Sequence, residues 1–454
     1  WSRFAALVLA PGVPLTHPEP HWTVQKATAA GVEIIGDTEL FFRERARLGS
    51  KARVIAITGT NGKTTVSWML RSIIAAAGST CGMLGTIEYS DGVQTVSAEL
   101  TTPGPADFWN WMRRMVRHGA THACMELSSH ALHQSRVAGL GLDVAILTNI
   151  TQEHFDDHAD FESYVSSNAR IRELVKTDGA VVVNNDDARL RRLVADNKPN
   201  RLVTFAIESP ADVRATVLAE SLQGSSFLLH LREDVQPVHL RLVGQHNIAN
   251  ALAAAAAAAA VGISLVDIVR GLEKLAVVPG RLERVEVDGR TNVFVDYAHT
   301  DDALRRSLWA LRGLTNGKLL CVFGAGGDRD RAKRPLLGRA AAEEADVAIV
   351  TSDNPRSEQP EAIIEDILAG FDRSRHKPMV EPDRQLAITR ALQLAQPGDC
   401  VLVAGKGHET VQIVGAERRP FDDRQAIRGA LELSCRDRGP KSVAASPGVQ
   451  TTRT

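Results

Sequence analysis

The sequence lacks the charge excess and the long apolar run that mark nucleic-acid-binding and membrane-spanning proteins. Lysine and arginine number 53 against 54 for aspartate and glutamate, so the formal net charge is −1. Without a basic excess there is no surface field to attract nucleic acid or an anionic membrane. The most apolar run, Ile248 to Ile263, is mostly alanine and shorter than a membrane span, so it predicts a buried interior helix. We therefore expect no nucleic-acid partner and no membrane span.

Cysteine is also scarce. The five cysteines are scattered without the spacing of metal ligands: Cys81, Cys124, Cys321, Cys400 and Cys435. An odd and sparse set is typical of a reducing compartment and not of a disulfide framework. No signal peptide is expected either. Together these absences predict a cytoplasmic protein.

The length of 454 residues is too great for a single ordinary core. We expect a partial N-terminal domain at 1–48, a central domain at 49–279, a C-terminal domain at 280–435 and a disordered tail at 436–454. Strands alternate with helices in both larger domains, which predicts α/β folds with doubly wound parallel sheets and ligands at the carboxyl ends of the strands. The expected strands of these domains are Arg53–Ile57, Thr121–Met125, Val144–Leu147, Ala180–Val183, Asn292–Val295, Leu319–Phe323, Val347–Val350 and Cys400–Val403.

The most informative stretch is a glycine-rich turn between an apolar strand and a helix. It consists of Gly59, Thr60, Asn61, Gly62, Lys63, Thr64 and Thr65. Glycines let the backbone turn sharply, so that its N–H groups and those of the new helix face an anion. Lys63 adds a mobile positive charge, and the Thr64 hydroxyl can hold magnesium. The stretch predicts binding of ATP with Mg2+, although Ile57 stands where the general P-loop pattern has glycine.

The form GTNGKTT resembles the superfamily of Mur ligases and folylpolyglutamate synthetases, which join an amino acid to a carboxylate using ATP. The resemblance implies an acyl-phosphate intermediate and a three-domain fold, with a P-loop sheet in the centre and a Rossmann-like C-terminal domain. The earlier segment APGVPLTHP…GVEIIGDTELF resembles the end of the UDP-binding domain in the D-glutamate-adding branch, although it is short for that domain. The alternative for this segment is an edge pair of strands without a ligand.

Glu126 follows an apolar strand, where a carboxylate can bind magnesium because this cation prefers hard oxygen ligands. Its alternatives are a surface carboxylate or a helix cap. The patterns TTPG from Thr101 and ME-SSHAL-xQxRV from Met125 resemble the tripeptide-forming branch of the Mur ligase family. This resemblance implies that the nucleotide-sugar dipeptide is held by Thr101, Thr102, Ser128, Gln134 and Arg136. Taken alone, Ser128 predicts a helix cap.

The same resemblance implies catalytic roles for Lys63, Glu126 and His154, with Thr64, Glu126 and His154 around the magnesium. His154 follows a strand, although the family usually has Asp-His where this chain has Glu153-His154. At the position of Asn168 the family carries a carbamylated lysine that helps to hold a second magnesium. Because asparagine is neutral, we expect weaker binding of a second magnesium, or compensation by another acid such as Asp157.

Three further positions match contacts of the superfamily to ATP. The pattern Gly-x-His-Asn opens a long helix and puts Asn247 near the adenine; the alternative is that Asn247 caps the helix. Arg281 would approach the phosphates. Asp296 ends a strand, where an aspartate can accept two hydrogen bonds from ribose hydroxyls.

Polar groups after three strands of the C-terminal domain predict an amino-acid pocket. They occur in GAGGDRD, DNPR and GKGHE. Arginine offers a planar fork to a carboxylate and glutamate attracts an ammonium, so the set suits a side chain that ends in a zwitterion, as in meso-diaminopimelate, better than lysine. DNPR also resembles the diaminopimelate-adding branch, which implies contacts from Arg329, Asp353, Asn354, Arg356, Gly405 and Glu409. The alternative is that these are surface turn residues.

These expectations combine into an ATP-dependent, ADP-forming ligase that adds meso-diaminopimelate to a UDP-muramoyl dipeptide. The resemblance places this reaction in peptidoglycan precursor synthesis, and hence in cell-wall biogenesis, cell shape and cell division. Its alternatives are a lysine-adding Mur ligase, a folylpolyglutamate synthetase-like ligase, or a catalytically weak relative that binds nucleotide. The variant turn and the later clusters disfavour a motor-type NTPase. The chain is expected to act as a monomer.

Overall fold

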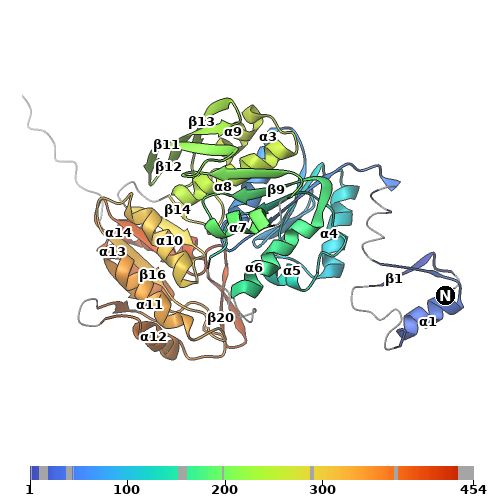
Figure 1. Ribbon diagram of the computed structural model, residues 1–454. Coiled ribbons are helices and arrows are strands. Elements are labelled where there is room, and N and C mark those ends of the chain that lie inside the picture. The colour runs from blue at the N-terminus through green and yellow to red at the C-terminus, as the bar shows by residue number, and fades with distance from the viewer. Residues whose placement is uncertain are drawn as a thin grey trace, which may run out of the picture. The chain divides into compact units, whose positions relative to one another are not determined.

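The computed structural model describes residues 1, 3–9, 19–36, 43, 45, 47–151, 161–196, 199–286, 291–372 and 377–437. The chain forms two compact units, Trp1–Glu283 and Arg284–Thr454. Figure 1 shows the helices and strands of both. No helix in these described ranges is both long enough and apolar enough to span a membrane. The predicted disordered tail lies, from residue 438 onward, outside the described residues.

The first unit begins with a small parallel pair of strands, β1 (Ala6–Leu9) and β2 (Glu33–Gly36), joined through α1 (Trp22–Ala29). A large sheet follows, in the order β13-β12-β11-β10-β9-β8-β3-β7-β4-β5-β6. Its strands are β3 (Arg53–Thr58), β4 (Cys81–Leu84), β5 (Glu88–Ser90), β6 (Thr95–Ser97), β7 (His122–Glu126), β8 (Leu142–Leu147), β9 (Val175–Asn184), β10 (Leu202–Ala206), β11 (Val213–Ser221), β12 (Gly224–Leu231) and β13 (Asp234–Leu240).

The centre of this sheet is parallel, as the strand–helix alternation predicts. All neighbours from β4 through β7, β3, β8, β9 and β10 to β11 pair in parallel. Both margins differ from the predicted all-parallel sheet, because β11–β12–β13 and β4–β5–β6 are antiparallel. Short connections such as that between β11 and β12 leave no room for a crossover helix, so consecutive strands reverse direction.

Helices cover both faces of the sheet. On one face lie α3 (Lys63–Ala76), α8 (Gln245–Ala260) and α9 (Leu265–Lys274), and on the other α4 (Pro105–Arg117), α5 (Ser129–His133), α6 (Phe161–Ala169) and α7 (Ala188–Asp196). Strand β3 serves both cores, because Ile55 and Ile57 face α3 and α8 while Val54 and Ala56 face α4. The alanines of α8 are fully buried from Ala251 to Ala258, which confirms the predicted interior helix.

The second unit is a doubly wound sheet in the order β14-β15-β19-β16-β17-β18. Its strands are β14 (Glu283–Val285), β15 (Asn292–Asp296), β16 (Leu319–Phe323), β17 (Val347–Val350), β18 (Met379–Val380) and β19 (Cys400–Ala404), and the pairs from β15 to β18 are parallel. Its helices are α10 (Asp301–Arg312), α11 (Lys333–Glu344), α12 (Pro360–Leu368), α13 (Arg384–Leu394) and α14 (Asp423–Asp437). A hairpin, β20 (Val411–Val414) and β21 (Glu417–Pro420), precedes α14.

Candidate active site

The turn between β3 and α3 has the shape of a phosphate-binding loop. Gly59 and Gly62 adopt φ angles of +128° and +89°. A Cβ on Gly59 would lie 2.3 Å from the Thr148 hydroxyl, and one on Gly62 would lie 2.3 Å from Oδ1 of Asn250. Glycine is therefore required at both positions for backbone angle and for space. Helix α3 begins at Lys63, directly after the turn, and offers its first N–H groups there.

Asn149, which lies just after β8, braces this loop through Asn61. The N–H of Asn61 donates to Oδ1 of Asn149 at 2.9 Å, and the Asn149 amide donates back to the Asn61 carbonyl at 3.1 Å. Lys63 folds over the turn, and its Nζ donates to the carbonyls of Gly59 at 2.5 Å and Thr60 at 3.0 Å. The loop is thus preformed. To meet a phosphate, the Lys63 ammonium must rotate away from the carbonyls of Gly59 and Thr60.

Glu126, the last residue of β7, is 1% exposed, so it is no surface carboxylate. Its carboxylate accepts hydrogen bonds from the hydroxyls of Thr64 at 3.0 Å and Thr86 at 2.8 Å, and from the Thr86 N–H at 3.0 Å. Gly85 provides the space, because a Cβ there would lie 2.4 Å from the carboxylate. A carboxylate beside two hydroxyls is an oxygen-rich set of the kind that magnesium prefers. No motif in the sequence pointed to Thr86.

Arg281 and the start of α8 also approach the loop. Nη2 of Arg281 donates to the Thr64 hydroxyl at 3.3 Å. Asn247 is 2% exposed and accepts from the Asn250 amide at 3.2 Å, and the Asn250 side chain in turn packs against Gly62. The helix-cap alternative for Asn247 is wrong, because the residue before α8 is Gly244 and the Asn247 amide donates to a backbone carbonyl of the preceding turn.

The residues predicted for the nucleotide-sugar dipeptide lie next to Glu126. The Thr102 hydroxyl donates to the Glu126 backbone carbonyl at 2.9 Å and accepts from the Ser128 N–H at 3.1 Å. Ser128 also caps α5, since its hydroxyl accepts from the Ala131 N–H at 3.1 Å. The cap and a ligand contact are compatible, because a hydroxyl oxygen has a second lone pair.

Arg136 completes this network. It donates from Nη1 to the Thr102 carbonyl at 3.1 Å and from Nε to Gln134 at 2.8 Å. The hydroxyl of Thr101 lies 3.1 Å from that of Thr86, which in turn bonds to Glu126. All five predicted residues therefore belong to one hydrogen-bonded network that includes Glu126 at the end of β7.

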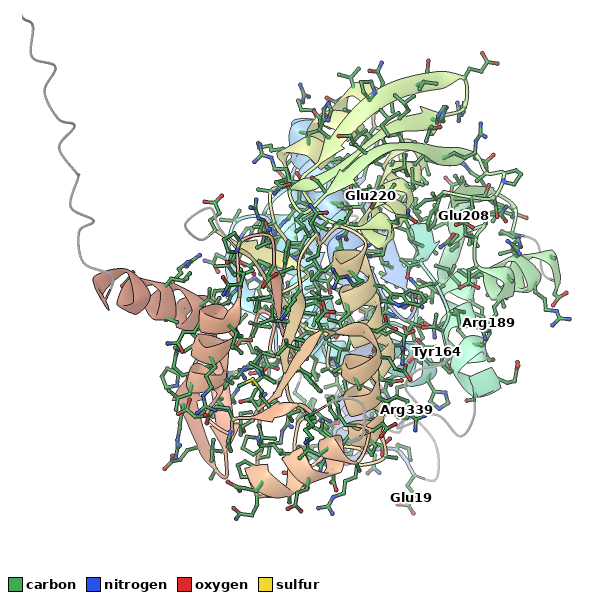
Figure 2. All side chains as sticks on the ribbon, turned by 90° about the vertical axis from the view of Figure 1, so that its left-hand side faces the viewer. Glu19, Tyr164, Arg189, Glu208, Glu220 and Arg339 are labelled. Carbon is green, nitrogen blue, oxygen red and sulfur yellow. The ribbon has the colours of Figure 1, made fainter. Side chains whose placement is uncertain are left out.

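Asn168 is fully buried, and its amide joins α6 to β3. The Thr58 hydroxyl donates to Asn168 Oδ1 at 2.7 Å, and Asn168 Nδ2 donates to the Tyr164 carbonyl at 2.9 Å. The Tyr164 hydroxyl lies 3.0 Å from that of Thr60, within the loop, and Figure 2 labels this tyrosine. A neutral amide thus occupies the position where the family resemblance implies a carbamylated lysine, whose side chain ends in a charged carboxylate.

His154 and Asp157 lie outside the described residues. Within the described part of the chain, no group of three or more His, Cys, Asp or Glu side chains forms a metal cluster. The oxygen atoms around Glu126 therefore remain the described set that best suits magnesium.

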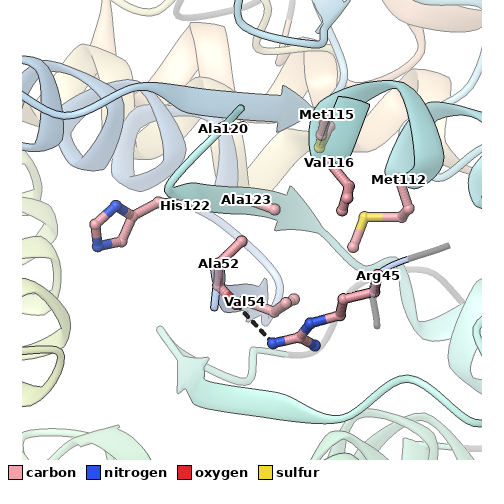
Figure 3. A pocket seen from close by; sticks show the side chains of 9 residues that line it. All are labelled: Arg45, Ala52, Val54, Met112, Met115, Val116, Ala120, His122 and Ala123. Atoms are coloured by element: carbon pink, nitrogen blue, oxygen red, sulfur yellow. Dashed lines mark hydrogen bonds between the residues drawn. The ribbon is translucent and has the colours of Figure 1, made fainter. Parts of the chain in front are cut away.

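A separate small pocket lies at the opposite end of the large sheet, at the amino ends of β3 and β7 (Figure 3). It is lined by Arg45, Ala52, Val54, Met112, Met115, Val116, Ala120, His122 and Ala123. Two of these lining residues bond to each other, since Arg45 donates to the Ala52 carbonyl at 3.0 Å. Because ligands of doubly wound sheets bind at the carboxyl ends of the strands, this pocket is not part of the site.

In the second unit, a buried lysine that sequence reasoning missed connects two predicted residues. Lys406 is 0% exposed, and its Nζ lies 3.0 Å from Oδ1 of Asn354, 3.1 Å from Oε2 of Glu409 and 2.7 Å from the Val411 carbonyl. The Asn354 amide donates to Glu409 at 2.8 Å. A lysine in a glycine-rich loop is ordinarily exposed, so nothing in the sequence indicates that this one is buried.

The two predicted arginines flank Gly326. Nη1 of Arg356 donates to the Gly327 carbonyl at 2.7 Å. A Cβ on Gly326 would lie 2.8 Å from Arg356 Nη1 and 3.6 Å from the Arg329 side chain. Arg356 adopts a φ of +52°, in the left-handed region that non-glycine residues seldom occupy. Such backbone strain concentrates at ligand sites.

Three predicted residues meet at the end of β19. A Cβ on Gly405 would lie 2.3 Å from Oδ2 of Asp353. The Gly405 N–H donates to the Asp296 carbonyl at 3.0 Å. One carboxylate oxygen of Asp296 accepts from the Ala298 N–H and the Ser307 hydroxyl, both at 3.0 Å. These contacts hold Asp296 at the carboxyl end of its strand, as predicted for a ribose contact.

An ion pair braces the loops that carry the arginines. Arg334 is 1% exposed and donates to the two carboxylate oxygens of Glu358 at 2.7 and 3.0 Å. Glu358 also accepts from the Asp328 N–H at 2.7 Å. The hydrogen bond from Arg334 lowers the pKa of Glu358 to about 2. The carboxylate therefore stays ionised at neutral pH and ties the two loops together.

Comparison with known proteins finds relatives of both units. The Mur ligase middle domain matches residues 57–258, and the glutamate ligase domain of Mur ligases matches residues 280–407. The UDP-N-acetylmuramoyl-L-alanyl-D-glutamate--2,6-diaminopimelate ligase of Solibacter usitatus is 42% identical over 394 residues, which cover 86% of this chain and 79% of the relative. The ligase of the same name from Gloeobacter violaceus is 44% identical over 390 residues, covering 84% and 77%.

A solved structure of a ligase with this name superposes with a TM-score of 0.64 at 32% identity, and covers 96% of this chain and 94% of the other. The fold and the phosphate loop define an ATP-using ligase of the Mur type. At this level of identity and coverage, the chain belongs to the Mur ligase family.

Proposed function

We propose that this chain is an ATP-dependent, ADP-forming ligase that adds meso-diaminopimelate to UDP-N-acetylmuramoyl-L-alanyl-D-glutamate. The observation that carries the proposal is the hydrogen bond between Asn354, after β17, and Glu409, after β19, with Arg356 two residues beyond Asn354, in a chain 42% identical to ligases named for this reaction. The arginine fork suits the carboxylate and Glu409 suits the ammonium at the far end of diaminopimelate.

The reaction makes an amide from a carboxylate, which is a poor electrophile. The carboxylate of the dipeptide attacks the γ-phosphorus of ATP, and the products are an acyl phosphate and ADP. The amine of the incoming amino acid then attacks the acyl carbon and phosphate leaves. No nucleophilic side chain is needed, because positioning and charge neutralisation supply the catalysis.

The residues at the phosphate loop would bind ATP. The backbone of Gly59–Thr65 and the Lys63 ammonium would neutralise the phosphate oxygens, with Arg281 and Asn247 on either side. Asp296 would accept hydrogen bonds from the ribose. The dipeptide would be held by Thr101, Thr102, Ser128, Gln134 and Arg136, and diaminopimelate by Arg329, Asp353, Asn354, Arg356, Gly405 and Glu409.

Magnesium would be held by Thr64 and Glu126, whose hydroxyl and carboxylate oxygens fit its preference, with His154 as the ligand implied by resemblance. When bound, the ion supplies positive charge to the phosphate oxygens. Because the reaction consumes ATP and a UDP-linked precursor, we expect it to take place in the cytoplasm. We expect small-molecule partners and a monomer.

The test is to supply the purified chain with ATP, magnesium and the UDP-muramoyl dipeptide, with and without an amino acid. We expect phosphate release only when both substrates are present, and tripeptide product with meso-diaminopimelate in strong preference to L-lysine. Product with lysine alone would identify the lysine-adding branch. ATP binding without product would identify a catalytically weak relative, the second candidate, which the neutral Asn168 favours.

A further inference from the structure

Lys406 holds two of the polar residues that the proposed pocket offers to the far end of the amino acid, Asn354 and Glu409. Its Nζ has three acceptors, the Asn354 amide oxygen, a Glu409 carboxylate oxygen and the Val411 carbonyl. An ammonium has three N–H donors, so one proton serves each acceptor. The side chain is fully buried, which leaves no donor for solvent or ligand.

The first consequence concerns the orientation of the Asn354 amide. Its Oδ1 accepts from Lys406 and from the Ile413 N–H, both at 3.0 Å. The amide nitrogen must therefore face Glu409, to which it donates at 2.8 Å. Its second N–H donates to no other described residue and is left for a ligand. Asn354 thus presents a donor, which suits a carboxylate and not an ammonium.

The second consequence concerns charge. Lys406 and Asn354 both bond to Oε2 of Glu409, while no described residue donates to Oε1. The Glu409 side chain is 28% exposed, so an incoming ammonium can reach it. The positive charge of Lys406, 3.1 Å away, offsets that of the carboxylate and weakens its attraction for a lone ammonium.

We propose that Lys406 is a positioning residue that makes this pocket select a zwitterionic end over a lone ammonium. The inference rests on the proposed function. A zwitterion gains from the oriented Asn354 donor and from Arg356 through its carboxylate, and loses little from the offset charge of Glu409. A lysine substrate has only its ammonium, which meets a neutralised acid and a donor that repels it.

The test uses the full chain with ATP, magnesium and the UDP-muramoyl dipeptide, and compares kcat/KM for meso-diaminopimelate and L-lysine. We expect Lys406→Met to lower the ratio of diaminopimelate to lysine at least about tenfold, equivalent to roughly 1.4 kcal/mol, chiefly through KM. The change should combine weaker use of diaminopimelate with improved use of lysine, because Glu409 regains its full charge and the Asn354 amide is free to turn.

The matched control is Arg305→Met, which removes a partly buried cation from this unit. Arg305 bonds to Glu343 and Glu344 and makes no hydrogen bond to Asn354 or Glu409. We expect a lower melting temperature and a ratio within about twofold of wild type, as for independent sites. Adding Glu409→Gln to Lys406→Met should abolish the gain in lysine use, since the attracting carboxylate is gone.

Lys406→Gln, which keeps a polar side chain but removes the charge, serves where Lys406→Met does not fold. A ratio that stays within about twofold of wild type in the folded Lys406 variant overturns the inference and leaves Lys406 with a structural role only. Failure of the proposed function would appear already in the wild-type chain, as absence of tripeptide with either amino acid.

Discussion

At the scale of single residues, two buried carboxylates of the large sheet have different surroundings. Glu126, at the carboxyl end of β7, accepts only from neutral hydroxyls and an N–H group. Asp143, near the amino end of β8, already has Arg53 at 2.9 Å and Lys176 at 2.7 Å. The charge of Asp143 is therefore matched within the protein, whereas that of Glu126 is matched by no cation that bonds to it among the described residues.

We predict that Glu126→Gln raises the magnesium concentration needed for half-maximal activity by at least about tenfold, because even the loss of an indirect partner of a metal lowers its affinity that much. The amide keeps the size of the side chain but has no charge. The measurement is activity as a function of magnesium concentration. Asp143→Asn is the control, and should lower the melting temperature with the magnesium curve unchanged. Equal magnesium curves for Glu126→Gln and wild type would remove this residue from the metal site.

A second prediction concerns Asn168, whose amide joins Thr58 to the Tyr164 carbonyl. If its neutrality limits a second magnesium, Asn168→Lys should lower the magnesium concentration that gives half-maximal activity, in buffer with bicarbonate to carbamylate the lysine. Asn168→Met, which has a similar length and no charge, should not do so. If the magnesium requirement of Asn168→Lys equals that of wild type, the neutral amide does not limit the binding of a second magnesium.

At the scale of elements, the phosphate loop and α3 depend on glycines in left-handed conformations. Gly62 precedes α3 and has no room for a side chain, whereas Gly78 follows α3 with a φ of +73° and nothing within 4 Å of its Cβ position. The two positions share the backbone cost of a side chain, about 1 kcal/mol. Only Gly62 adds a collision, because a Cβ there would lie 2.3 Å from Oδ1 of Asn250.

We therefore predict that Gly62→Ala abolishes ATP binding, while Gly78→Ala costs about 1 kcal/mol of stability and leaves ATP binding unchanged. Titration with a fluorescent ATP analogue measures the first effect and denaturant unfolding the second. Normal nucleotide affinity in Gly62→Ala would mean that the loop does not hold the phosphates.

The sequence predicted the central strands and the phosphate loop because both carry strong local signals. Strands buried on both faces, such as β3 and β8, appear as continuous apolar runs. The antiparallel margin of β11, β12 and β13 was not predicted. Strand β12 is buried only at alternate positions, such as Phe227 and Leu229, and this alternation is a weaker signal than a continuous apolar run. The burial of Lys406 could not be predicted, because it depends on contacts between separate loops that no local sequence pattern indicates.

At the scale of the whole molecule, several carboxylates have pKa values below their usual range. Burial would raise the pKa of Asp143, but hydrogen bonds from Lys176, the Val54 N–H and Arg53 outweigh it and hold the pKa low. In the second unit the hydrogen bond from Arg334 lowers the pKa of Glu358 to about 2. Asp91, Asp186, Asp328 and Asp422 also have lowered pKa values. In the acidic range these carboxylates therefore bind fewer protons in the folded protein than in the unfolded one.

These shifts fix the sign of the dependence of stability on pH. A lowered pKa in the folded state contributes stability that is complete above the unfolded values of about 3.9 for Asp and 4.3 for Glu. It is lost as the pH falls through the folded values, and the 53 lysines and arginines with 14 histidines then repel one another without compensation. We predict a melting temperature that is steady from neutral pH to about pH 5 and falls steeply between about pH 4 and pH 2. Asp143→Asn should start lower and fall less, because one of the titrating groups is gone. A wild-type melting temperature that stays level to pH 2 would contradict the ion pairs described in both units.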